Sequence, residues 1–168
     1  AECLRAAAAG ERLAQAREQQ RRGFQRLKVK IGRPPSDGGK AADLRALTAI
    51  REAVGDDLVL VVDTNGAYDA ADAIRMGRAM EPLDIRWFEE PCHWYDDVAL
   101  MARVRAQTRI PITAGQSEIT SHGVRRLIDA GAVDIINYDA SEGGGVTDWR
   151  RAAALAATAG LAMAHHEE

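Results

Sequence analysis

The pattern of hydrophobic and polar positions along the chain switches between that of a short strand and that of a longer helix, and this switch recurs six times. Short apolar stretches have the length and composition of strands at residues 27–31, 58–62, 85–88, 111–114, 134–138 and 161–165. Before and between them lie longer segments with helical composition or amphipathic spacing, at residues 3–22, 40–54, 69–80, 95–107, 120–130 and 146–159. The pattern therefore predicts six strands that alternate with helices.

The spacing of the predicted strand ends indicates how the strands are arranged. The ends fall near residues 30, 63, 89, 114, 138 and 165, so that successive ends are 33, 26, 25, 24 and 27 residues apart. A strand–helix repeat of this size is typical of parallel strands joined by right-handed crossovers. Two α/β architectures have this repeat, an open doubly wound sheet and a (β/α) barrel.

Polar residues at the strand ends favour the barrel. Nearly every predicted strand ends in a charged or polar side chain, whereas an open sheet concentrates its ligand residues at one switch point. A closed barrel needs about 250 residues, and this chain has 168. We therefore expect residues 1–168 to form one partial (β/α) barrel domain in which some units of the barrel are absent.

Composition and charge exclude several classes of protein. Apolar residues make up 46% of the chain and charged residues 28%, with a net charge of −3, so no basic field attracts nucleic acid or an anionic membrane. The longest apolar run, residues 152–164, is shorter than the ~20 residues of a membrane span. Two isolated cysteines and the absence of a visible signal peptide predict a cytoplasmic protein.

Carboxylates directly follow two of the predicted strands. Asp63 ends the run 59–62, and Glu89 and Glu90 end the run 86–88. A carboxylate at the end of a buried strand is costly unless it is paired or binds a cation, and oxygen ligands favour Mg²⁺ over zinc or copper. The alternative is that each carboxylate caps the helix that follows it.

Lys28 and Lys30 are two residues apart on one predicted strand, so their side chains point to the same face. In a barrel this face is the interior, because the opposite face packs against helices. A desolvated lysine beside another cation has a lowered pKa and can act as a base. The alternative is an edge strand with two solvated lysines.

Asp139 and His166 follow two consecutive predicted strands. A carboxylate that holds a histidine fixes its tautomer and raises its basicity, which yields a general acid or base. A histidine near a chain end has no such role in most proteins, so this prediction depends on the position of His166 one strand after Asp139.

Taken together, these motifs resemble the enolase superfamily, and within it the mandelate racemase subgroup. The resemblance lies in Lys28-Val29-Lys30, Val62-Asp63-Thr64-Asn65-Gly66, Phe88-Glu89-Glu90-Pro91, Ala114-Gly115-Gln116, Asp139 and His166. The steps from Asp63 to Glu89, Gln116, Asp139 and His166 are 26, 27, 23 and 27 residues. The resemblance covers nearly the whole chain and depends on this order and spacing, since each motif alone is weak.

The resemblance implies a (β/α)7β barrel with its second to seventh strands present, and with the first strand, the last strand and the N-terminal capping domain absent. It implies Mg²⁺ on Asp63, Glu89 and a third ligand, Lys30 as a base with Lys28 beside it, an Asp139–His166 dyad on the opposite side, and Asn65 positioning the substrate. The family usually has Glu as its third ligand. Here Gln116 occupies that position, with Glu118 as the alternative.

The resemblance further implies removal of the proton α to a carboxylate, which gives an enediolate. Family members with the histidine dyad are mostly similar to sugar-acid dehydratases, so the resemblance favours an acid-sugar dehydratase that acts on a small carboxylate. The full-length protein is expected to be a homo-oligomer. Two alternatives remain open: a racemase or epimerase of 2-hydroxy acids with the same site, and a catalytically incompetent barrel fragment. A nucleotide-binding open sheet is disfavoured, because no G-x-G-x-x-G motif follows a strand.

Overall fold

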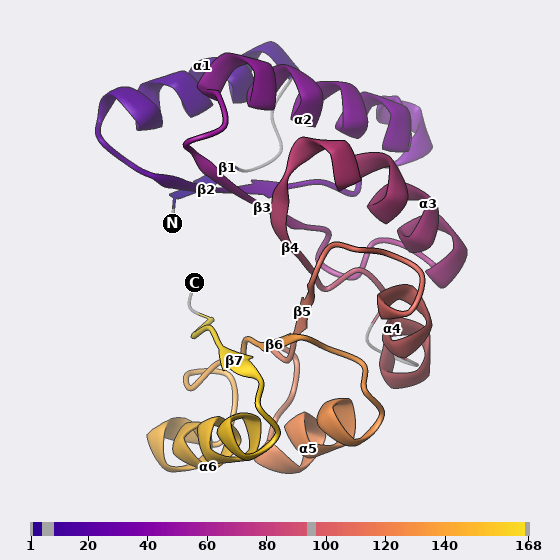
Figure 1. Ribbon diagram of the computed structural model, residues 1–168, viewed down its shortest axis with the longest axis vertical. Coiled ribbons are helices and arrows are strands. Elements are labelled where there is room, and N and C mark those ends of the chain that lie inside the picture. The colour runs from indigo at the N-terminus through magenta and orange to yellow at the C-terminus, as the bar shows by residue number, and fades with distance from the viewer. Residues whose placement is uncertain (1, 5–8, 94–96, 167–168) are drawn as a thin grey trace.

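A computed structural model describes residues 2–4, 9–93 and 97–166. Seven parallel strands form one sheet in the order of the sequence (Figure 1). They are β1 Glu2–Leu4, β2 Arg26–Lys30, β3 Val59–Asp63, β4 Ile85–Glu89, β5 Ile112–Ala114, β6 Ile135–Ile136 and β7 Ala162–Met163. The helices are α1 Ala9–Arg21, α2 Gly39–Val54, α3 Ala70–Met80, α4 Asp97–Arg105, α5 Ser121–Asp129 and α6 Gly145–Thr158, with short 3-10 turns η1 Pro35–Asp37 and η2 Glu81–Leu83.

The sheet is curved, and the helices lie along its outer side (Figure 1). Each strand pairs in parallel with the next one in sequence, as in a (β/α) barrel. Within the described residues no pairing joins β1 to β7, so the arc of strands is not closed. The predicted incomplete barrel is confirmed, and the six predicted strands all form.

The predicted helix at residues 3–22 is wrong at its beginning. Glu2–Leu4 form a strand that pairs with Leu27–Val29, and the helix begins at Ala9. The expectation that no strand precedes the one at 27–31 is wrong for the same reason. Pairing along the free edge of β2 overrides the helical composition of this segment, because local propensity is weaker than tertiary contacts.

The core lies between the sheet and its helices. On β2 and β3 the alternation places Leu27, Val29, Leu60 and Val62 in this core, all of them fully buried. Lys28 and Lys30 alternate with these core residues along β2, so their side chains point to the opposite, inner face. No helix in the described part of the chain has the length and apolarity needed to cross a bilayer.

Parallel register aligns the ends of neighbouring strands. Lys30 is paired with Asp63, Asp63 with Glu89, and Glu89 with Thr113. An isolated bridge pairs Asp139 with His166 beyond the ends of β6 and β7. Because paired residues of parallel strands point to the same face, this register gathers the charged side chains at the carboxyl edge of the sheet.

Candidate active site

One cluster of charges lies at the carboxyl ends of β2, β3 and β4. The Lys28 ammonium is 2.5 Å from Glu89 Oε1 and 3.1 Å from Asp63 Oδ2. Lys30 Nζ is 3.0 Å from the same Asp63 oxygen. Both carboxylates are buried, and each lysine retains partial exposure. The two carboxylates therefore converge on one point from neighbouring strands, and the edge-strand interpretation of the lysines is wrong.

The expected lowering of a lysine pKa does not hold for Lys28. Burial disfavours the charged ammonium, but the adjacent carboxylates of Glu89 and Asp63 outweigh burial and raise the Lys28 pKa above its ordinary value. The prediction was wrong because it considered the neighbouring lysine and not the two carboxylates that face Lys28 across the sheet.

Asn65 connects the charge cluster to Gln116. Asn65 adopts a left-handed backbone with φ of 52°, and its N–H donates to Asp63 Oδ1 at 2.8 Å. Its side-chain oxygen accepts from Lys30 Nζ at 3.4 Å and from Gln116 Nε2 at 3.2 Å. Gln116 Oε1 is buried and has no hydrogen-bond partner among the described residues. The structure thus brings Gln116 to the cluster and leaves its oxygen available for a ligand.

Glu118 lies elsewhere. A Cβ added to Gly123 would fall 1.5 Å from Glu118 Oε2, so this carboxylate rests on the first turn of α5. A larger side chain at position 123 would therefore require Glu118 to move. Of the two candidate third ligands, Gln116 is the one hydrogen-bonded to Asn65.

Glu90 is buried beneath the cluster and ties three strand ends together. Its Oε1 accepts from the N–H groups of Gly115 and Gln116 at 2.9 and 3.3 Å, and its carbonyl accepts from Thr64 Oγ1 at 2.5 Å. Burial raises the Glu90 pKa to about 8, although the two backbone hydrogen bonds oppose this shift. Burial therefore favours the neutral form of Glu90, and its side chain holds the segment that carries Gln116.

Asp139 and His166 form a separate pair beyond β6 and β7. His166 Nδ1 lies 2.8 Å from Asp139 Oδ2, and both side chains are buried. Asp139 Oδ1 accepts from the N–H and the hydroxyl of Ser141, each at 2.6 Å. Burial disfavours the Asp139 carboxylate, but hydrogen bonds from Ser141 and His166 outweigh it and lower its pKa. An ionised Asp139 accepts from the Nδ1–H tautomer of His166, and in that tautomer Nε2 is the ring nitrogen that does not face Asp139.

The two groups of side chains are not in contact. Among the described residues, no hydrogen bond or ion pair links the Asp139–His166 pair to the lysine–carboxylate cluster. The sheet curves between them, so that β2 and β7 lie on opposite sides of the arc (Figure 1). A proton donor or acceptor is therefore present on each side of the inner face.

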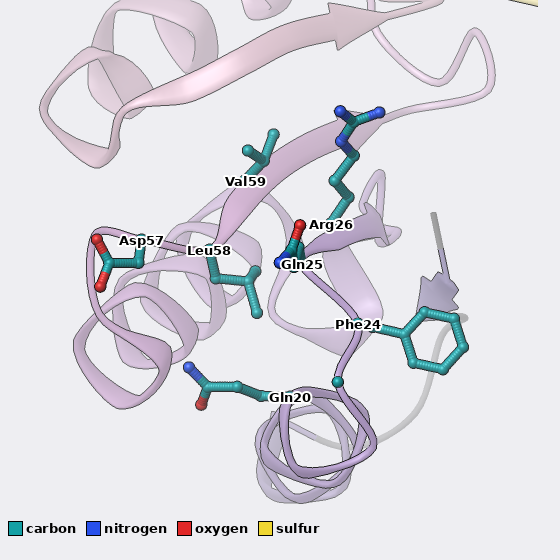
Figure 2. A pocket seen from close by; sticks show the side chains of 8 residues that line it. Gln20, Phe24, Gln25, Arg26, Asp57, Leu58 and Val59 are labelled. Atoms are coloured by element: carbon teal, nitrogen blue, oxygen red, sulfur yellow. The ribbon is translucent and has the colours of Figure 1, made fainter.

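A separate hollow in the described chain lies away from this chemistry. It has a volume of about 480 Å³ and is found at the amino ends of β2 and β3 (Figure 2). Its lining includes Gln20, Phe24, Arg26 and Asp57. None of the predicted site residues lines it, so it carries no argument about the reaction.

Sequence reasoning missed Trp87 and the structural role of Glu90. Trp87 Nε1 donates to Glu89 Oε2 at 3.0 Å. The two-residue alternation of a strand could have found it, because residues 87 and 89 must point to the same face. The role of Glu90 had no such signal, since its contacts reach segments 25 residues away in the sequence.

Comparison with known proteins identifies the family. The model of the enolase C-terminal domain-like family matches residues 11–167. The chain is 36% identical to D-galactarolactone cycloisomerase of Agrobacterium fabrum, covering 89% of this chain and 38% of that protein. It is 38% identical to L-talarate/galactarate dehydratase of Salmonella typhimurium, covering 83% of this chain and 34% of that protein.

A solved structure agrees with this assignment. L-talarate dehydratase from Polaromonas sp. JS666, complexed with Mg and L-glucarate, superposes with a TM-score of 0.90 at 31% identity, covering 99% of this chain and 46% of that one. The chain therefore spans less than half the length of each of these three proteins. On the family match and these identities, the chain belongs to the enolase superfamily, in its mandelate racemase and muconate lactonizing enzyme family.

Proposed function

We propose that residues 1–168 are the partial-barrel catalytic domain of a Mg²⁺-dependent enzyme that removes the proton α to a carboxylate, and that the reaction is the dehydration of an acid sugar. The observation that carries the proposal is the convergence of Asp63 and Glu89 on one ammonium, with Lys30 beside them and the Asp139–His166 pair across the sheet. The relatives named as dehydratases and the neighbour complexed with L-glucarate support this choice of substrate.

The donor set fits a hard divalent cation. The buried carboxylates of Asp63 and Glu89 both lie within 3.1 Å of the Lys28 ammonium, and two carboxylates this close together favour a neighbouring cation. The unpartnered Gln116 Oε1 supplies a third, neutral oxygen. The described residues contain no group of three acidic, histidine or cysteine side chains that could hold a metal, so the amide is needed to complete the set. Oxygen ligands of this kind favour Mg²⁺.

Each side chain has a role in this proposal. Lys30 removes the α-proton, and its contacts with Asp63 and Asn65 hold the amine at the inner face. Lys28 places a positive charge beside the carboxylate of the substrate, and Asn65 positions the substrate. His166, oriented by Asp139, protonates the departing β-hydroxyl group. When bound, the cation would offset the charge that develops on the carboxylate oxygens of the enediolate.

A racemase or epimerase is the second candidate. It uses the same residues, but His166 returns a proton to the α-carbon from the other side. Lys30 belongs to β2 and His166 follows β7, and these strands lie on opposite sides of the arc (Figure 1). This arrangement favours epimerisation as much as dehydration, and relatives of the chain include an epimerase. An incompetent fragment is the third candidate.

Incubation of the full-length gene product with Mg²⁺ and a panel of sugar acids in D₂O separates the three. Dehydration gives a 2-keto acid, which semicarbazide detects, and epimerisation gives α-deuterated substrate without any keto acid. Deuterium exchange without a 2-keto acid on every sugar acid would reject dehydration. Absence of both exchange and Mg²⁺ binding would support the incompetent fragment.

A further inference from the structure

Trp87 lies two residues before Glu89 on β4, and its side chain points to the same inner face of the sheet. Both residues belong to β4, where Phe88 between them is buried in the core on the opposite side. The indole Nε1 of Trp87 donates to Glu89 Oε2 at 3.0 Å. We propose that Trp87 is a positioning residue that makes Glu89 bind the cation through one oxygen and thereby selects Mg²⁺ over Ca²⁺. This inference rests on the proposed metal site.

The two oxygens of Glu89 have separate partners. Oε2 accepts from the indole of Trp87, and Oε1 lies 2.5 Å from the Lys28 ammonium, where Asp63 also converges. The indole N–H is a donor that does not titrate, and the half-buried ring restricts its motion. Glu89 is therefore held with Oε1 on the side where Asp63 also converges and with Oε2 toward the indole.

One available oxygen per carboxylate matters for the choice of cation. Mg²⁺ demands near-ideal octahedral geometry at short distances, whereas Ca²⁺ accepts six to eight oxygens and often binds both oxygens of a carboxylate. With Oε2 held by the indole, Glu89 would have to break or bend this hydrogen bond in order to offer both oxygens to one Ca²⁺ ion. Loss of the indole N–H frees Oε2 and lets the carboxylate rotate toward two-oxygen binding.

The test is a comparison of two tryptophan variants of the full-length gene product. Trp87→Phe removes the N–H donor and keeps an aromatic ring. Trp149→Phe is the matched control, because its indole Nε1 is buried without a hydrogen-bond partner among the described residues. Titration calorimetry measures the Kd of each variant for Mg²⁺ and for Ca²⁺, with circular dichroism as a check on folding.

We expect Trp87→Phe to weaken Mg²⁺ binding by about 10-fold to 100-fold, the range found when outer-shell partners of metal ligands are removed. Binding of Ca²⁺ should weaken less or become tighter, so that the Mg²⁺/Ca²⁺ preference falls. Trp149→Phe should bind both ions as the unchanged protein does. Equal affinities for Trp87→Phe and the unchanged protein, or a parallel loss for both ions, would overturn the inference.

A measurement on the unchanged protein covers the case in which Trp87→Phe does not fold. In ¹⁵N-labelled protein the Trp87 indole N–H should stay protected from solvent exchange after Mg²⁺ is added, because its bond to Glu89 persists. Rapid exchange of this N–H in the Mg²⁺ form contradicts the inference. If the protein binds no Mg²⁺ at all, the proposed metal site itself is wrong. If it binds Mg²⁺ and Trp87→Phe binds it equally well, only the role of Trp87 is wrong.

Discussion

Charged side chains at the two ends of the parallel sheet have different kinds of partner. At the amino ends, the Arg51 guanidinium of α2 donates to four backbone carbonyls, those of Gly55, Leu58, Leu83 and Asp84, at 2.7 to 3.1 Å. At the carboxyl ends, two lysines and two carboxylates share one small volume, and the Gln116 oxygen lacks a partner. The first arrangement satisfies neutral groups, whereas the second concentrates groups that a ligand can satisfy.

Residues that stabilise the fold and residues suited to chemistry therefore lie at opposite ends of the sheet. The carbonyls around Arg51 belong to the turns that enter β3 and β4, so this residue fixes how those strands begin. The cluster at the other end uses residues in left-handed backbone, Asn65 and Glu90, to aim its side chains. Changes at the amino end should therefore lower stability, and changes at the carboxyl end should lower binding or turnover.

The largest effects are expected from the residues assigned to proton transfer. Lys30→Ala should lower both α-proton exchange and turnover by about 10²-fold to 10⁴-fold, the usual range for a general acid or base. His166→Asn should lower 2-keto acid formation by a similar factor and retain exchange, because Lys30 still removes the α-proton. Both rates are measured in D₂O on the full-length gene product.

His165→Asn is the matched control for the histidine, since it removes the neighbouring imidazole, which contacts Trp149 and not Asp139. Full turnover after Lys30→Ala and His166→Asn contradicts the roles proposed for these residues.

At the amino end, Arg51→Met should reduce the free energy of unfolding by about 3 kcal/mol, because one buried and three partly buried carbonyl groups lose a charged donor. The exposed Arg45 on the same helix provides the control, and Arg45→Met should change stability by less than about 0.5 kcal/mol. Urea unfolding gives both values. If Arg51→Met instead lowered turnover at unchanged stability, the division between the two ends would not hold.

Gln116→Glu tests the carboxyl end by adding a charge. The variant should bind Mg²⁺ about tenfold or more tightly, since one added charge near a cation is worth roughly a few kcal/mol at the effective dielectric of a protein. Without metal, the same variant should unfold more readily, because a third carboxylate then faces Asp63 and Glu89. Calorimetric Mg²⁺ titration and metal-free unfolding measure the two effects. Equal affinity in both forms argues against Gln116 as a ligand.

The last effect, which is confined to metal-free protein, concerns the proton on Glu90. Its folded pKa of about 8 is raised, so the folded state binds the proton more tightly than the unfolded state. The stability from this group is complete below an unfolded pKa of about 4.5 and is lost as pH rises to about 8, by roughly 1.4 kcal/mol per pH unit at most. Glu90→Gln should remove this slope in metal-free protein. Urea unfolding at pH 5 and 8 compares the variant with the unchanged protein.

The fold was predictable because each element repeats a local pattern. Continuous apolar runs such as 58–62 and amphipathic segments such as 40–54 predicted strands and helices that the structure reproduces. The strand at Glu2–Leu4 was not predictable, because three residues have no period of their own and depend on pairing with β2.

Much of the candidate site was also predictable, since the parallel register of β2, β3 and β4 must bring Lys30, Asp63 and Glu89 together. The direction of the Lys28 pKa was missed, because it depends on which atoms face each other across strands. The bond from Trp87 lies within β4, where the two-residue alternation places Trp87 and Glu89 on one face but does not tell which atoms meet. Side-chain rotamers carry this information, and the order of residues along the chain does not.

The four carbonyls bound by Arg51 also bear on how the chain folds. They lie 4, 7, 32 and 33 residues from Arg51 in sequence, so this one side chain connects α2 to the residues that precede β3 and β4. The chain segments that these contacts close are no longer than 33 residues. Contacts of low sequence separation form early in folding. We expect residues 39–89 to fold first and to be the last to lose amide protection in native-state hydrogen exchange, so that later strands add to a sheet that is already established.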